Sequence, residues 1–218
     1  MSERLLGAVV GMHGDDKGLI MPPSIAPFQV VVMPVASHSD DNVMPAVESL
    51  AADLNASGIR ATIDSRDVRP GVKHYDWEIK GAPIRVELGP RDLKSSKCIA
   101  TLRTGGKLEV DLDSAPMKIS ELLSEVSDEM RKRANSVASA LVQEFPIENL
   151  DSNEHDSIVS DGIVYEIAFD GNDSDAEILE KKTGLTLLGE CDESFEDPRK
   201  CLVTGNNTTK KQYIARMY

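Results

Sequence analysis

The organising stretch of the chain is residues 59–107, which read IRATIDSRDVRPGVKHYDWEIKGAPIRVELGPRDLKSSKCIATLRTGGK. Residues 59–63 and 84–88 have the length and apolar content of strands. In 84–88, apolar side chains alternate with Arg85 and Glu87. Because successive side chains of a strand point to opposite faces, Arg85 and Glu87 are expected to share one face of a sheet.

The rest of this stretch predicts a short helix and a hairpin. Residues 72–80 are expected to be helical and 64–71 to form the charged loop before them. Residues 97–103 and 108–112 are expected to pair as a hairpin around the turn Gly105-Gly106.

The segment before residue 59 completes a β-α-β unit. Residues 28–35 form a largely apolar run typical of a strand buried on both faces. Asp40-Asp41-Asn42 offers a helix cap, residues 43–54 carry apolar side chains at helical spacing, and Gly58 supplies the stop. This order predicts a right-handed crossover and parallel pairing of the strands.

A long amphipathic helix is expected over residues 117–145. Its apolar stripe consists of Ile119, Leu122, Leu123, Val126, Met130, Val137 and Leu141. The sum is an α/β fold with a mixed five-stranded sheet flanked by helices.

A small α+β unit is expected after an acidic surface linker at 146–163. Its elements are a strand at 163–169, a helix at 176–182, a strand at 185–188 and a final hairpin ending in 213–218.

Charge is unevenly distributed along the chain. From Arg60 to Lys107 there are 11 Lys/Arg and 6 Asp/Glu, whereas the whole chain has a formal net charge of −13. A basic island in an acidic chain favours a local anion-binding surface, although chance variation on a solvated surface can give the same pattern. The overall acidity argues against a general nucleic-acid coat protein but leaves room for a local RNA site.

The cysteines indicate the cellular setting, and no signal peptide is expected. Cys98, Cys191 and Cys201 are too few and too scattered for a disulfide framework, which indicates a reducing cytoplasm. The apolar run 5–12 is far too short to span a membrane.

Two sets of motifs stand out, one in residues 64–92 and one in residues 13–27. The first set is Asp64-Ser65-Arg66-Asp67, Pro70-Gly71, Lys73, Trp77-Glu78-Ile79-Lys80-Gly81, Pro83 and Arg85-Val86-Glu87-Leu88-Gly89-Pro90-Arg91-Asp92. It is similar to the anticodon-binding domain of prolyl-tRNA synthetases, and the resemblance to this family extends over nearly the whole chain. The second set, His13-Gly14-Asp15-Asp16-Lys17-Gly18-Leu19, Met21-Pro22-Pro23 and Ala26-Pro27, resembles the segment that joins the catalytic domain to this domain. His13 to Asp16 could suggest a metal site, but a turn in a stiff linker is favoured.

The resemblance implies the class II synthetase anticodon-binding fold and a partner, the anticodon loop of tRNA(Pro). The guanine-reading positions of the family fall on Glu78, Arg85, Arg91, Asp92 and Lys107. Arginine pairs bidentately with guanine O6 and N7, and a carboxylate accepts from N1 and N2, so these residue types suit an anticodon that ends in two guanines.

Two alternatives concern individual residues of this set. Glu78, Arg85 and Asp92 could form only a surface ion-pair network of little value to stability. Trp77 could stack on a base, although its place beside Ile79 on the predicted helix favours core packing.

The resemblance divides the chain into residues 1–27, a remnant of the catalytic domain and a linker, then 28–145 and 146–218. Residues 2–12 are predicted to be a short helix, with Ser2 as a possible cap. Arg4 matches the arginine of the third signature motif, which contacts ATP in the family. The first two motifs have no counterpart, so the chain is expected to lack the ATP and proline pockets and to be inactive alone. The complete enzyme is expected to use ATP and magnesium and to be a homodimer, whereas this piece is expected to be mostly monomeric.

Zinc is expected to be absent. Many members of the family carry four cysteines in their C-terminal domain, and the same spacing falls here on Asp170, Asp175, Cys201 and Thr204. Two carboxylates, one thiolate and a hydroxyl bind tetrahedral zinc poorly, and Cys191 as a substitute would still leave a weak site.

The sequence therefore favours tRNA(Pro) anticodon recognition as part of prolyl-tRNA synthetase, with no membrane or DNA partner. One alternative is a free-standing tRNA-binding accessory protein, or a partner of a separately encoded catalytic half. Another is a structural domain that has lost RNA binding, which retention of the five guanine-reading positions argues against.

Overall fold

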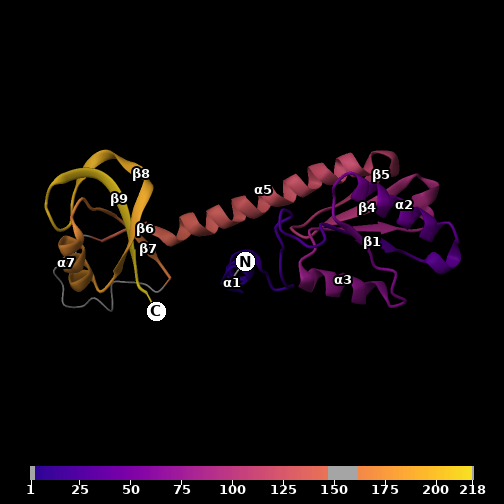
Figure 1. Cartoon of the computed structure of the whole chain (residues 1–218), viewed down its shortest axis with the longest axis horizontal. Helices are drawn as coiled ribbons and strands as arrows, with labels where there is room; N and C mark the ends of the chain where they lie inside the picture. The colour runs from indigo at the N-terminus through magenta and orange to yellow at the C-terminus, as the bar shows by residue number, and fades with distance from the viewer. Residues whose placement is uncertain (1–2, 147–161, 218) are drawn as a thin grey trace. The chain divides into compact units, whose positions relative to one another are not determined.

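The chain folds into two compact units, Met1–Ala134 and Asn135–Tyr218. The computed structural model describes residues 3–146 and 162–217, and Figure 1 shows a separate sheet in each unit. Most of the predicted linker at 146–163 lies outside the described residues, as does Ser2. No described helix combines the length and the apolar content needed to cross a membrane.

The first unit is built on a mixed five-stranded sheet, as predicted, with the strand order β2-β1-β3-β4-β5. β1 pairs in parallel with β2 and β3, and β3, β4 and β5 pair antiparallel. The strands are β1 (Val30–Pro34), β2 (Ala61–Ile63), β3 (Ile84–Leu88), β4 (Lys97–Leu102) and β5 (Lys107–Asp111). The α-helices are α1 (Glu3–His13), α2 (Val43–Ala56), α3 (Pro70–Lys80), α4 (Pro90–Lys94) and α5 (Ala115–Leu141).

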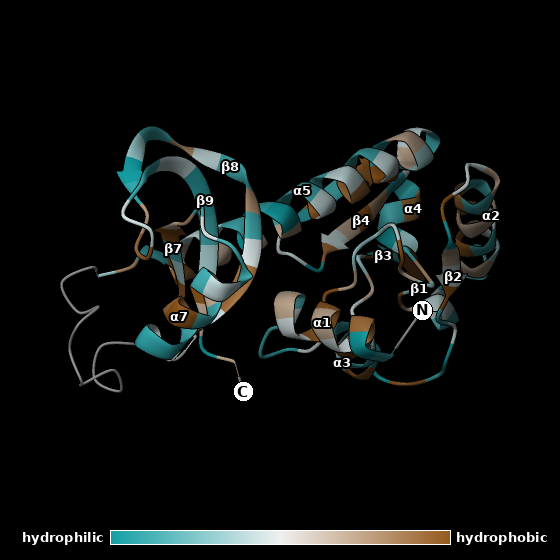
Figure 2. Cartoon of the chain, turned by 60° about the vertical axis from the view of Figure 1, so that its left-hand side comes forward, coloured by the Kyte–Doolittle hydropathy of each residue, from teal (hydrophilic) through white to brown (hydrophobic). Residues whose placement is uncertain are grey.

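Helices cover the two faces of this sheet unequally. The main core joins Val30, Val32, Ile84 and Val86 of the strands to apolar side chains of α2 and α5. On the other face, α3 packs Trp77 against Val31, Met33 and Ala82. Figure 1 shows α3 on the opposite side of the sheet from α5, and Figure 2 shows the hydrophobic strands between these layers. The alternation predicted for 84–88 is confirmed, so Arg85 and Glu87 lie on the α3 face.

The α3 face remains open over β4 and β5. Cys98, Ala100 and Val110 are buried on the α5 side, whereas the alternating residues of both strands are partly or fully exposed. Positive φ angles at Gly105 and Gly106 form the turn between the strands, as predicted. The open face and this turn border the site described below.

The second unit has a four-stranded sheet with the order β6-β7-β9-β8. Its elements are β6 (Val142–Glu144), β7 (Val164–Ala168), α7 (Asp173–Thr183), β8 (Thr186–Lys200) and β9 (Asn207–Ala215). Phe145, Tyr165, Ile167, Phe169, Leu179 and Ile214 are among its buried core residues. It is the α+β unit that the sequence predicts.

Several predicted bounds are wrong. The long helix ends at Leu141 rather than Phe145, because residues 142–144 pair with β7 and Phe145 enters the second core. Val137 and Leu141 are exposed, so the buried stripe of α5 ends at Met130.

Two further differences concern a strand and a short helix. The strand predicted at 185–188 is part of β8, which continues to Lys200 through several register shifts. Most of this extension is exposed and has no apolar alternation, so hydrophobic periodicity could not reveal it. α4 was not predicted, and the side chain of Asn42 makes no capping hydrogen bond to α2.

Candidate functional site

Two predicted site residues meet between α3 and β3. A Glu78 carboxylate oxygen lies 3.2 Å from Nη1 of Arg85, whose side chain is 13% exposed. Nε of Arg85 is buried and has no hydrogen-bond partner among the described residues. A buried donor without an acceptor costs about 1–3 kcal/mol, which marks this guanidinium as a group with unused hydrogen-bonding capacity.

Both side chains line a cavity of about 330 Å³ on the α3 face. Lys107, at the start of β5, lines the same cavity, and Trp77 and Ala82 contribute apolar walls. A largely buried arginine beside a carboxylate offers donors and acceptors to a planar ligand, and a nucleobase carries both on its edges.

A second ion pair continues along the same two elements. His74, one turn before Glu78, places Nε2 2.6 Å from a carboxylate oxygen of Glu87. The other oxygen of Glu87 lies 3.9 Å from Nζ of Lys107. Glu87 thus joins α3 to the lysine at the cavity, a role that its alternation with apolar residues in β3 does not indicate.

Arg91 and Asp92 lie elsewhere, on α4, and do not line this cavity. α4 packs against β4 and α2, and the Asp92 carboxylate accepts a 2.9 Å hydrogen bond from the N–H of Gly89. The structure therefore brings three of the five predicted residues together. The alternative prediction is an ion-pair network of Glu78, Arg85 and Asp92. Among the described residues, only Glu78 and Arg85 pair, and Asp92 bonds to the backbone of Gly89 instead.

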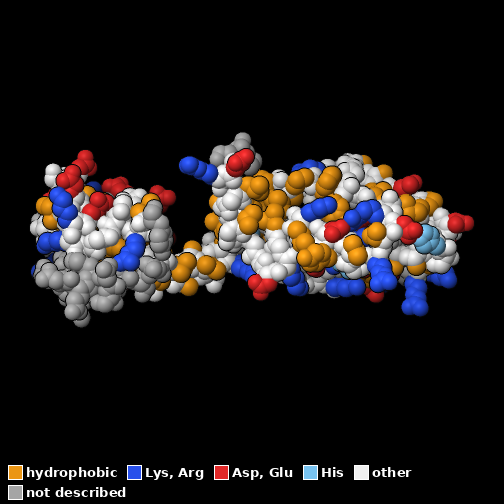
Figure 3. Space-filling model, turned by 90° about the horizontal axis from the view of Figure 1, so that it is seen from below, with side chains coloured by type: hydrophobic (Ala, Val, Ile, Leu, Met, Phe, Trp, Pro, Cys, Tyr) orange, Lys and Arg blue, Asp and Glu red, His pale blue; other side chains and the backbone are white. Residues whose placement is uncertain are grey.

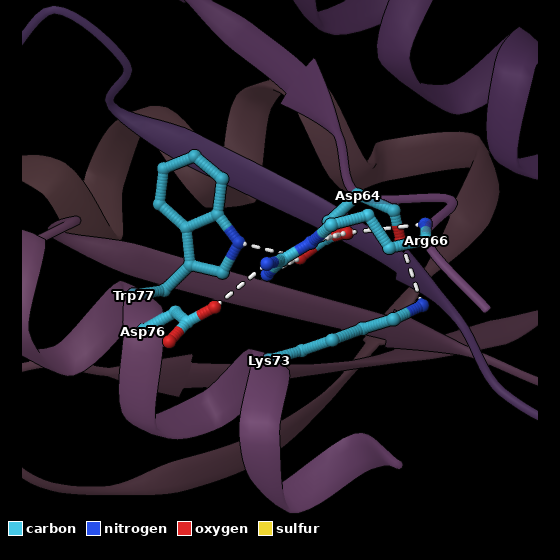
Figure 4. Close-up of polar contacts among 5 residues, drawn as sticks. All are labelled: Asp64, Arg66, Lys73, Asp76 and Trp77. Carbon is cyan, nitrogen blue, oxygen red and sulfur yellow. Dashed lines mark hydrogen bonds and ion pairs between the residues drawn. The ribbon is translucent and has the colours of Figure 1, made fainter. Parts of the chain in front are cut away.

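A buried carboxylate fixes α3 over the sheet. Asp64, which follows β2, accepts hydrogen bonds from Nε and Nη2 of Arg66 at 2.9 and 2.8 Å and from Nε1 of Trp77 at 2.8 Å. Arg66 also reaches Asp76, and Nζ of Lys73 donates to the Asp64 carbonyl, as Figure 4 shows. The Arg66 guanidinium holds the pKa of the Asp64 carboxyl well below its usual range.

Trp77 therefore has a structural role. Its ring belongs to the core under α3, which confirms the core-packing prediction, and it meets Phe28 edge to face with ring centroids 6.3 Å apart. Its indole also lines the cavity beside Glu78.

The segment before β1 is docked on the same region. Nη1 of Arg103 donates to a carboxylate oxygen of Asp15 at 2.8 Å, and Nη2 donates to the other oxygen and to the Gly18 carbonyl. The Arg103 guanidinium holds the pKa of the Asp15 carboxyl well below its usual range. The turn predicted at 13–16 lies at residues 15–18 instead, because His13 is the last residue of α1. Its partner Arg103 was not predicted, because a contact across 88 positions leaves no local pattern.

Arg4 lies in the first turn of α1 and is exposed. No residue of α1 is buried, and Leu5, Leu6 and Val10 are each about half exposed. The family assigns Arg4 to ATP, and that role stays a prediction for this chain.

The four positions that match family zinc ligands do not fit zinc. The Asp170 carboxylate accepts a hydrogen bond from the Thr204 hydroxyl at 2.8 Å, which lowers the pKa of Asp170. Asp175 accepts from the N–H of Asn172 and so caps α7, and Cys201 is buried. Within residues 3–146 and 162–217, no group of three or more His, Cys, Asp or Glu side chains could hold a metal ion.

Basic side chains are spread over the α3 side of the first unit. Figure 3 shows them among exposed hydrophobic groups on that face. They include Lys17, which lines the cavity beside Lys107. This distribution suits an anionic ligand.

Comparison with known proteins gives one family and several relatives. Residues 29–122 match the family described as "Anticodon binding domain". The chain is 34% identical to a proline–tRNA ligase of Methanobrevibacter smithii and 36% identical to one of Methanoregula boonei, with alignments that cover the whole chain. These alignments cover 46% and 45% of the relatives, so the chain spans about half of their length.

A solved structure gives the same match. The fold is similar to that of Giardia lamblia prolyl-tRNA synthetase in complex with prolyl-adenylate, with a TM-score of 0.81 and 25% sequence identity. This match covers the whole chain and 49% of the Giardia protein.

Proposed function

Because this chain is homologous to the C-terminal part of prolyl-tRNA synthetases and contains their anticodon-binding domain, we propose that its Glu78–Arg85 cavity reads a guanine of the tRNA(Pro) anticodon. The observation that carries the proposal is the largely buried Arg85 guanidinium, whose Nε has no hydrogen-bond partner among the described residues and which has a carboxylate beside it. Arginine donates to guanine O6 and N7, and Glu78 accepts from N1 and N2. Single-stranded loops expose both edges to such a pair.

The whole protein then ligates proline to tRNA with ATP and magnesium, as a cytoplasmic homodimer. In this proposal the present chain supplies tRNA recognition, has no DNA partner and is inactive without the catalytic domain. The half-exposed Leu5, Leu6 and Val10 of α1 support contact with that domain, because an isolated amphipathic helix gains stability by covering its apolar side. In this proposal the C-terminal unit folds without zinc. Of the four positions that match family zinc ligands, Asp170 and Thr204 bond to each other, Asp175 caps α7, and Cys201 is buried.

Arg85→Ala is expected to weaken binding of a tRNA(Pro) anticodon stem-loop about tenfold, because one bidentate contact to guanine is lost. The ratio of the affinity for this stem-loop to the affinity for one with adenine in place of an anticodon guanine should fall by a similar factor. Titration of the 218-residue chain with fluorescent stem-loops measures both effects.

Two further variants separate base reading from charge. Arg85→Lys keeps the positive charge but loses the planar fork, so it should also lose discrimination. Arg131→Ala removes an exposed arginine of α5 and should leave binding unchanged. Equal discrimination by wild-type and Arg85→Ala chains would contradict guanine reading by this cavity.

A further inference from the structure

Lys17 is presented to the cavity by a tightly held turn. The N–H and carbonyl groups of Asp15 and Gly18 bond to each other, with both N···O distances 3.0 Å. The N–H of Lys17 donates to the Asp15 carboxylate at 2.9 Å. That carboxylate is in turn gripped by Arg103, whose side chain is 4% exposed. The backbone beneath Lys17 is therefore fixed by an ion pair that is largely shielded from water.

The turn also lies directly against the end of α3. The N–H of Leu19 donates to the Ile79 carbonyl at 3.2 Å, and Nε of Arg103 donates to the Glu78 carbonyl at 3.3 Å. Gly18 has φ +130°, and a Cβ there would stand 2.6 Å from Cα of Ile79. Only glycine allows this approach, which places the turn beside the residue proposed to read guanine.

The ammonium group of Lys17 is not used by the hydrogen bonds that hold the turn within the part of the chain that the structure describes. Its side chain is exposed and lines the cavity, and it has no ion-pair partner among the described residues. Lys107, which lines the same cavity, is instead paired with Glu87 at 3.9 Å. A lysine that lines a cavity from a fixed backbone, with no ion-pair partner among the described residues, is suited to bind an anion there.

We propose that Lys17 binds the RNA phosphate next to the base that occupies the Glu78–Arg85 cavity. The inference rests on the proposed function, since a base held inside the cavity leaves its phosphate at the rim. Lysine binds phosphate as a compact charge and does not distinguish bases. Lys17 therefore raises the affinity for RNA and fixes the position of its backbone, without sequence preference. A segment between two domains thereby becomes part of the RNA-binding surface.

The test compares Lys17→Gln, Lys17→Arg and Arg85→Ala chains with wild type on matched and guanine-substituted stem-loops over a range of salt concentrations. Lys17→Gln should weaken binding of both stem-loops equally, by about threefold at 0.1 M salt. The slope of log affinity against log salt should fall by about 0.7, the value for one phosphate contact on a single strand. Lys17→Arg should keep the wild-type slope. Lys118→Gln, the same charge change on α5 over the opposite sheet face, should have little effect.

The outcomes separate the two proposals. If Arg85→Ala reduces discrimination but Lys17→Gln keeps the wild-type slope, the phosphate contact is wrong and guanine reading stands. If Lys17→Gln weakened binding of the matched stem-loop more than binding of the guanine-substituted one, Lys17 would contact a base rather than a phosphate. That result would also overturn the inference. If Arg85→Ala has no effect, or the wild-type chain does not bind the stem-loop, the proposed function fails first.

Discussion

Asp64→Asn is expected to lower the free energy of unfolding of the first unit by about 3 kcal/mol. The carboxylate is buried and accepts hydrogen bonds from Arg66 and from the indole of Trp77. An amide of the same size can accept at only one atom and carries no charge, so the Arg66 guanidinium loses its buried partner. Urea unfolding followed by the fluorescence of Trp77, the single tryptophan, measures the change.

Asp67→Asn is the matched control for this substitution. Asp67 lies in the same loop, but its side chain is 90% exposed and its ion pair with His38 spans 3.4 Å. The expected loss is below about 0.5 kcal/mol. Equal effects of the two substitutions would show that the Asp64 network does not hold α3.

The contribution of Asp64 should also depend on pH. The folded-state pKa of Asp64 is lowered far below the unfolded value of about 3.9, so its stabilisation is present above pH 4 and is lost as the pH falls further. The difference in stability between wild type and Asp64→Asn should therefore narrow below about pH 4.

Gly81→Ala is expected to cost about 3 kcal/mol of stability and to release the segment before β1. Gly81 ends α3 with φ +73°, and a Cβ there would lie 2.6 Å from the carbonyl oxygen of Leu19. The N–H of Met21 donates to the Gly81 carbonyl, so displacement of this backbone also breaks that bond. Hydrogen exchange should become faster at the amides of Leu19 and Met21.

Gly58→Ala separates backbone strain from steric conflict. Gly58 has φ +82°, but a Cβ there would meet nothing within 4 Å. Its replacement should cost about 1 kcal/mol, from the left-handed conformation alone. If Gly81→Ala were no worse than Gly58→Ala, the docking of residues 15–21 on α3 would contribute nothing to stability.

The first sheet was predictable because its signals are local. Ile84, Val86 and Leu88 alternate with polar residues, and the apolar run at 28–35 with the helix after it specifies a β-α-β unit. β8 was predicted too short because its exposed arm follows its partner strand rather than an apolar pattern. α5 ends at Leu141 because residues 142–144 pair with β7 and Phe145 packs in the core of the second unit. Helical periodicity of apolar residues cannot predict this tertiary packing.

The site was predictable in part. Family motifs selected Glu78, Arg85 and Lys107, and the structure places all three around one cavity. Arg91 and Asp92 come from the same motif but lie on α4, because the chain turns away from the α3 face after β3. The contact of Asp15 with Arg103 depends on tertiary packing alone, so no local pattern indicates that Lys17 borders the cavity.

Guanine reading by Arg85 can be tested by exchanging a single atom of the RNA. Replacement of each anticodon guanosine in turn by 7-deazaguanosine deletes the N7 acceptor, and binding is measured with wild-type and Arg85→Ala chains. If Arg85 binds guanine N7, the modified base at one position should weaken wild-type binding about tenfold but have almost no effect on Arg85→Ala. The same loss with both chains, or no loss with wild type at either position, would contradict guanine reading by Arg85.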